Sequence, residues 1–136
     1  MKLLLSLFIL LLTSSTLAAS NLTVTITGID SSKGRIIVLL FDENKKDSFP
    51  EFADVRRLDT PAKKGHTSVV FKNIPNAVYA LSILHDKNNN GEMDTNFIGI
   101  PSEPYGNSGE KTNFKPNFND SKFDLEKDTN IKVVIH

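Results

Sequence analysis

The stretch Leu22-Thr23-Val24-Thr25-Ile26-Thr27 decides the fold class of this chain. Apolar residues occupy every second position and threonines lie between them, which is the period-2 pattern of a strand with one buried face. Most of these side chains are β-branched, and such side chains pack well on a pleated surface. The stretch therefore predicts a half-buried strand.

Other segments of strand character follow along the chain. Residues 35–41 are a continuous apolar run, and we expect them to form a hairpin with residues 22–27 across a turn at 30–34. Strand patterns also occur at residues 67–71, 78–84, 123–125 and 131–135. Short strands separated by turn signals, with almost no helix, predict an all-β fold. We expect an antiparallel β-sandwich of about seven strands, immunoglobulin-like or prealbumin-like.

Two segments interrupt the strand pattern. Phe49, Phe52 and Val55 lie three residues apart, and Pro50 occupies a place that suits the first turn of a helix. These residues predict one short helix, followed by a connecting loop at 59–65. A second, longer interruption covers residues 86–120, where no regular pattern is present. Ordered loops of that length are usually functional, so we expect function to reside there.

The N-terminal segment has the three-part pattern of a secretory signal peptide. Met1-Lys2 is a short basic start, residues 3–12 are almost wholly apolar, and residues 13–20 are small and polar. Cleavage triplets at 16–18 and 17–19 predict a signal peptide of residues 1–19 and a single β-sandwich domain of residues 20–136. We therefore expect an extracytoplasmic protein, periplasmic or secreted, with no stable membrane insertion after cleavage.

The composition excludes several classes of protein. No cysteine is present, so a disulfide framework, a lipid-modified cysteine and a cysteine nucleophile are all ruled out. Without Lys2, fifteen Lys and Arg residues stand against sixteen Asp and Glu residues, and the longest basic runs are isolated pairs. We expect no nucleic-acid partner, because such a partner calls for a basic face.

The run Asp86-Lys87-Asn88-Asn89-Asn90-Gly91-Glu92-Met93-Asp94 has the ligand spacing of a calcium loop. Calcium prefers six to eight oxygen ligands, and oxygen-bearing side chains on alternate residues can turn toward one ion. Gly91 would supply the corner with positive φ. The predicted metal ligands are the side chains of Asp86, Asn88, Asn90 and Asp94, the backbone carbonyl of Glu92, and Glu103.

An ordinary polar turn remains the alternative to a metal loop. Asn and Asp favour turns because they tolerate left-handed backbone and bond to their own main chain. Position 12 of the calcium loop, normally a bidentate Glu, is Phe97 here. Glu103 is the nearest carboxylate that could replace it. With so few carboxylates, calcium binding would be weak, as in extracellular modules.

The chain resembles the bacterial family known as domain of unknown function 2141, whose members are exported and uncharacterised. The resemblance spans essentially the whole mature domain. It rests on these strings: His85-Asp86 with the Asn-x-Asn-Gly-x-x-Asp run, residues 95–101, Glu103-Pro104-Tyr105-Gly106, residues 114–125, Gly34-Arg35-Ile36, and Asn73-Ile74-Pro75 with Tyr79-Ala80. The resemblance implies an extracytoplasmic β-sandwich and no established activity.

Catalytic motifs are scarce, so we expect a non-catalytic binding or structural module. His66 and His136 are expected to be exposed, and His85 to be a hydrogen-bonded histidine at a strand end. Phe97 and Tyr105 would present a surface for a saccharide or a peptide, although they could also tether the loop to the core. The rival interpretation is an envelope-directed hydrolase that uses Asp86, Asp94 and Glu103 as its carboxylates.

Overall fold

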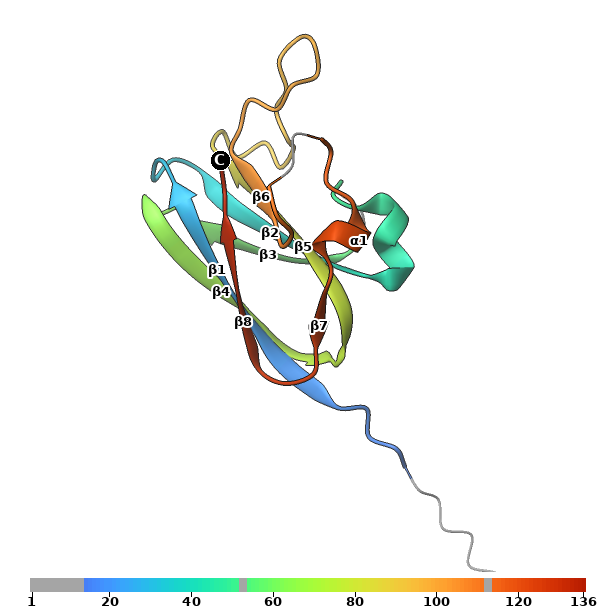
Figure 1. Ribbon diagram of the computed structural model, residues 1–136. Helices are drawn as coiled ribbons and strands as arrows, with labels where there is room; N and C mark the ends of the chain where they lie inside the picture. Colours follow the sequence, from blue (N-terminus) through green and yellow to red (C-terminus); the bar gives the residue numbers. More distant parts are fainter. Residues whose placement is uncertain (1–13, 52–53, 112–113) are drawn as a thin grey trace, which may run out of the picture.

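The computed structural model describes residues 14–51, 54–111 and 114–136. The basic start and apolar run of the predicted signal peptide lie outside these ranges. The elements are, in chain order, β1 (Ala19–Ile29), β2 (Arg35–Asp42), the 3-10 helix η1 (Glu43–Ser48), β3 (Arg56–Pro61), β4 (Gly65–Pro75), β5 (Ala77–Asp86), β6 (Tyr105–Asn107), α1 (Phe118–Ser121), β7 (Phe123–Leu125) and β8 (Thr129–Val134). The predicted all-β sandwich is confirmed (Figure 1).

The strands form two sheets. The three-stranded sheet has the order β4-β1-β8, and the five-stranded sheet has the order β3-β2-β5-β6, with β7 also paired to β5. The pairing of β1 with β8 is parallel, whereas all the other pairs are antiparallel. The expected hairpin of residues 22–27 with 35–41 is wrong, because β1 and β2 belong to different sheets. Alternation identifies the buried face of a strand but not its partner across the ladder.

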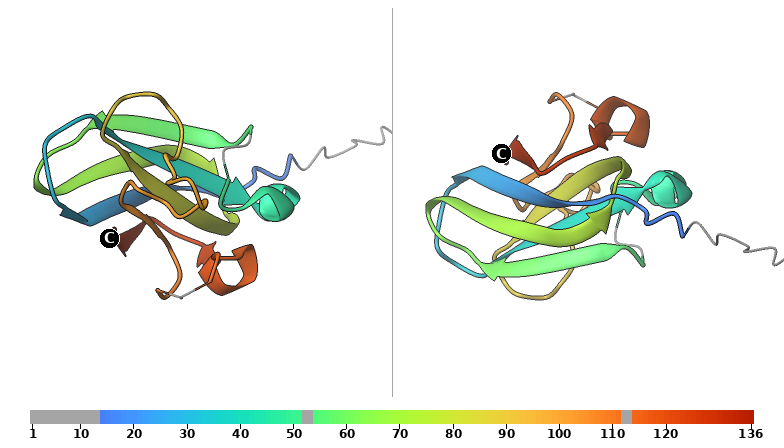
Figure 2. Two further views of the ribbon diagram at one scale, coloured as in Figure 1. Left: turned by 90° about the horizontal axis from the view of Figure 1, so that it is seen from above. Right: turned by 90° about the horizontal axis from the view of Figure 1, so that it is seen from below.

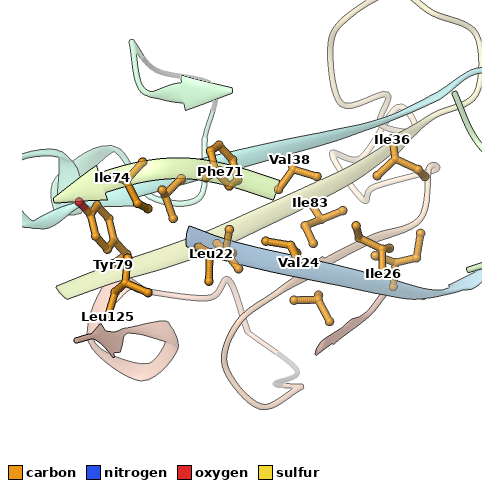
Figure 3. Packing of buried hydrophobic residues seen from close by; sticks show 14 of the residues in the cluster. Leu22, Val24, Ile26, Ile36, Val38, Phe71, Ile74, Tyr79, Ile83 and Leu125 are labelled. Carbon is orange, nitrogen blue, oxygen red and sulfur yellow. The ribbon is translucent and has the colours of Figure 1, made fainter. Parts of the chain in front are cut away.

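The core lies between the two sheets. Leu22, Val24 and Ile26 of β1 are fully buried, and they share one apolar cluster with Ile36 and Val38 of β2 (Figure 3). Each such side chain contributes about 1.5 to 3 kcal/mol by leaving water. The alternation that predicts the first strand thus matches its burial in the sandwich.

A second apolar cluster covers the outer face of the five-stranded sheet. Ile37, Leu39 and Phe41 of β2 point away from the main core and pack with Phe49 and Phe118. The Phe49 ring meets both the Phe41 and the Phe118 rings edge to face. This explains why residues 35–41 are apolar throughout: the strand is buried on both faces. Figure 2 shows η1 and α1 at the same end of the molecule.

Two expectations outside the main strands need correction. The helical turn lies at Glu43–Ser48, before Phe49 and not after it, and the predicted position Phe52 lies outside the described residues. Residues 59–61, expected in a loop, belong to strand β3. The region 86–120 also contains strand β6 and the start of α1.

Candidate functional site: the loop after strand β5

The loop begins at Asp86, the last residue of β5, opposite Arg35 at the start of β2. These two residues are direct register partners in the antiparallel pair. Gly34, just before Arg35, has φ of +70°, and a Cβ atom there would lie 2.0 Å from the Asp86 carbonyl oxygen. Only glycine allows this approach of the two backbones. The turn at 30–34 therefore sets the place where the loop starts.

The Asp86 carboxylate is fully buried and organises the first half of the loop. Its Oδ2 accepts hydrogen bonds from Arg35 Nε at 2.9 Å and from the Gly91 amide at 2.9 Å. Its Oδ1 accepts from the Asn90 amide at 3.1 Å. Gly91 has φ of +80°, so the predicted positive-φ corner is confirmed. The buried charge of Asp86 is thus compensated by a cation and two backbone donors.

Three further side chains of the predicted metal set meet above Asp86. Asn88 Nδ2 donates to Oδ2 of Asp94, and Asn90 Nδ2 donates to Asp94 Oδ1 at 2.7 Å. The Asn88 Oδ1 accepts from the Asn90 amide, and the Asn90 Oδ1 accepts from the Glu92 amide. Asn88, Asn90 and Asp94 therefore turn toward one another, as the spacing predicts.

Glu103 lies beside the loop and is buried. Its Oε1 accepts from the Lys87 amide at 2.8 Å, and its Oε2 accepts from the Asp94 amide at 3.2 Å. One carboxylate therefore joins both ends of the run 87–94. The sequence places Glu103 near the loop, but this clamp on the backbone is a role that sequence reasoning missed.

Ion pairs surround the start of the loop. Lys87 Nζ bonds Asp30 Oδ2 at 2.6 Å, and this bond to Lys87 holds the pKa of the Asp30 carboxyl below its ordinary value. Asp59 accepts hydrogen bonds from Arg57 and also pairs with Arg35 at 3.2 Å. The bond from Arg57, followed by the charges of Arg57 and Arg35, lowers the pKa of Asp59.

His66 and His136 match the expectations for them, whereas the ring of His85 is hydrogen-bonded at Nε2 only, and its buried Nδ1 has no hydrogen-bond partner among the described residues. His85 is buried, and its Nε2 lies 2.8 Å from the carbonyl oxygen of Lys33. Its Nδ1 lies 3.5 Å from Asp30 Oδ1. His66 and His136 are exposed. His85 therefore fastens the 30–34 turn to the end of β5.

The donor set of the loop is made of oxygen atoms, which is the chemistry of a hard cation. Within residues 14–51, 54–111 and 114–136, no three His, Asp or Glu side chains form a metal-binding group. The set would instead combine one carboxylate, Asp94, with the amide oxygens of Asn88 and Asn90. To present its oxygen to an ion, each amide would turn and give up the bond that its oxygen now accepts from the Asn90 or Glu92 amide. The residues present thus fit a calcium ion held by few charges.

The aromatic residues of the loop region separate in space. Phe97 is 100% exposed at the loop tip, whereas Phe118 is buried as a member of the outer apolar cluster. Tyr105 lies in β6, half exposed, where its backbone bonds that of His136 in both directions. Tyr105 lines two cavities, of about 560 and 610 Å³, and Phe97 is not among their described lining residues. The structure thus places Tyr105 beside two cavities and Phe97 at the exposed tip.

The carboxylates of the hydrolase interpretation do not face these cavities. Asp86 and Glu103 are buried and bonded to backbone amides. Of the described residues that line the two cavities, none is Asp86, Asp94 or Glu103.

The helices of the described ranges are too short or too polar to cross a bilayer.

Sequence reasoning missed Arg35 as a residue of the site. The signal for it was the string Gly34-Arg35-Ile36, in which glycine and arginine precede a buried strand. Arginine at the first residue of such a strand suits a carboxylate on the neighbouring strand end. The pairing of β2 with β5 was needed to name Asp86 as that carboxylate.

Two features now define the class of this protein: a two-sheet β-sandwich, and a polar Asn- and Asp-rich loop clamped at one end of it. The model of the family described as "Uncharacterized protein conserved in bacteria (DUF2141)" matches residues 24–133 of this chain. The match covers most of the chain, and the chain belongs to that family. No curated protein and no solved structure matches it.

Proposed function

We propose that this chain is an exported, non-catalytic β-sandwich module of the cell envelope or exterior, in which the 86–94 loop binds calcium. The observation that carries the proposal is the meeting of Asn88 and Asn90 on the Asp94 carboxylate. The side-chain amide of each Asn donates an N–H to a negatively charged oxygen of Asp94. A cation in that place would supply the positive charge itself, and the amides would present their oxygens to it.

Asp86 and Glu103 act in this proposal mainly as supports for the loop. Both carboxylates accept backbone amide bonds that fix the path of residues 87–94. Asp94 supplies the charge, while Asn88, Asn90 and the Glu92 carbonyl supply neutral oxygens. So little ligand charge supports weak affinity, with a Kd of about 10⁻⁴ to 10⁻³ M. Such a site fills only where calcium is abundant, which agrees with export.

Isothermal titration of residues 20–136 with calcium tests the ion site. The expected result is one ion per chain with a Kd in the range of about 10⁻⁴ to 10⁻³ M. Asp94→Asn removes the central charge and should abolish the heat of calcium binding. The matched control is Asp124→Asn, an exposed carboxylate on β7, which should bind as the wild type does. An absence of heat in the wild type, or equal heat in Asp94→Asn, overturns the proposal.

Export is the second part of the proposal and has its own test. Sheet pairing of β1 begins at Ala19, next to the predicted cleavage positions. Removal of residues 1–18 would therefore keep the pairings of β1 and lose the bond from the Asn76 amide to the Ala18 carbonyl. Expression in a bacterial host followed by N-terminal sequencing should give a chain that starts at Ala19 or Ser20. A chain that still starts at Met1 would contradict export by this route.

A further inference from the structure

The loop tip that follows Asp94 is a closed, protruding hairpin of unusual exposure. A bridge between Thr95 and Pro101 closes its base, and the Ser102 amide donates to the Asp94 carbonyl at 2.8 Å. Phe97 is 100% exposed, Ile98 65% and Ile100 54%. The tip is the orange loop at the top of Figure 1, away from both sheets. Three large apolar side chains of the protruding tip are therefore exposed to water.

The backbone amides of Asn96, Ile98, Gly99 and Ile100 are bonded within the tip. The Asn96 side-chain oxygen accepts from the Ile98 and Ile100 amides, each at 3.0 Å. The Asn96 amide donates to the Ile100 carbonyl at 2.8 Å, and the Gly99 amide donates to the Asn96 carbonyl at 3.0 Å. This bonding lowers the cost of moving the tip out of water, because an unpaired backbone group in an apolar medium is costly.

The tip also carries no charge. Residues 95–102 contain no Asp, Glu, Lys, Arg or His, so no ion would have to be desolvated when the tip enters an apolar phase. Phe114, itself 84% exposed, lines the same cavity as Ile100 and Pro101 and adds a further apolar side chain beside the tip. A protein partner would need a pocket shaped to the protruding tip, whereas a fluid lipid surface adapts to it.

We propose that the tip, residues 96–100, inserts reversibly into the surface of a lipid bilayer. Phe97, Ile98 and Ile100 enter the boundary between headgroups and acyl chains, and Asn96 keeps the backbone bonded inside. The sandwich stays in water, so this contact is peripheral and needs no membrane-spanning helix. The proposal stands independently of calcium binding, although the calcium-type loop holds the base of the tip.

The chain contains no tryptophan, so Phe97→Trp places a single fluorescent reporter at the tip. On addition of phosphatidylcholine vesicles, Trp emission should shift to shorter wavelength and quenching by acrylamide should fall. Because the tip is uncharged, adding phosphatidylglycerol to the vesicles should change little. Val70→Trp is the matched control, because Val70 is exposed on β4, outside the tip. Its emission should stay unshifted.

Vesicle sedimentation gives the second measurement. Phe97→Ser should lower the partition coefficient at least about tenfold, because burial of one Phe accounts for that much affinity. Since Phe97 is fully exposed, the unfolding transition of the Phe97→Ser variant should match that of the wild type. The proposal is overturned if neither kind of vesicle shifts the emission of the Phe97→Trp variant. It is also overturned if the Val70→Trp control shifts equally, or if only a saccharide or peptide produces the shift. A shift that persists in chelator supports insertion even if calcium binding fails.

Discussion

Arg35 and Asp86 face each other across the β2–β5 pair, and the whole candidate site starts from that contact. Arg35 also reaches Asp59, while Asp86 gathers the amides of Asn90 and Gly91. One arginine thus links three strands to the polar loop. The buried carboxylate is a structural centre first, and the loop shape follows from it.

Asp86→Ala should destabilise the domain by about 2 to 4 kcal/mol, because it leaves the Gly91 amide and Arg35 Nε without their acceptor. Urea unfolding in the presence of chelator measures this effect without any contribution from calcium. Asp124→Ala, an exposed change on β7, should stay within about 0.5 kcal/mol of the wild type. Equal stabilities for the two variants would show that Asp86 does not support the loop.

Gly34→Ala should cost about 2 to 4 kcal/mol, because strain at positive φ adds to a clash with the Asp86 carbonyl. The chain offers a matched control in Gly65. Its φ is +100°, but a Cβ atom there would meet nothing within 4 Å. Gly65→Ala should therefore cost only about 1 kcal/mol from backbone strain. If urea unfolding gives the two variants the same loss, the close approach at Gly34 has no energetic importance.

At the scale of elements, the outer apolar cluster holds the C-terminal half of the loop region. Phe118, at the start of α1, is buried against Phe49 and the outer side chains of β2. Phe118→Ala should lose about 3 to 5 kcal/mol of stability. Phe97→Ala, the same change at a fully exposed position, should be nearly neutral. A neutral Phe118→Ala would mean that the cluster does not anchor this region.

The strands most visible in the sequence are those with a clear burial pattern. Residues 22–27 alternate because β1 buries one face, and residues 35–41 are continuously apolar because β2 buries both. Strand β3 was missed because it carries the polar sequence Arg56–Pro61 at a sheet edge. The pairing of β1 with β4 and β8 instead of β2 was also unpredictable, since pairing depends on contacts distant in sequence.

The candidate site was predictable in its location but not in its bonding. Spacing alone placed Asn88, Asn90 and Asp94 together, and it required positive φ at Gly91. Spacing could not show that Asp86 pairs with Arg35, because that contact depends on the register of two strands. The clamp by Glu103 likewise depends on a chain reversal through the tip.

For the whole molecule, the ion pairs at this end predict acid sensitivity. Hydrogen bonds from Arg57 lower the pKa of Asp59, and Lys87 lowers that of Asp30. A folded-state pKa below the unfolded value gives stability that is present above about pH 4 and lost as the pH falls through the folded pKa. The urea midpoint should therefore fall between pH 5 and pH 3. The double variant Asp30→Asn, Asp59→Asn should show a shallower fall; an identical fall would contradict the assignment.

Thermal unfolding of residues 20–136 with calcium and with chelator tests the central claim most directly. At calcium tenfold above the Kd, binding to the folded state adds about 1.4 kcal/mol, which raises the Tm by several degrees. Asp94→Asn should have the same Tm with calcium as with chelator. The Tm of Asp124→Asn should rise with calcium as that of the wild type does. A wild-type Tm that stays unchanged up to several millimolar calcium would show that the loop is a polar turn and not a calcium site.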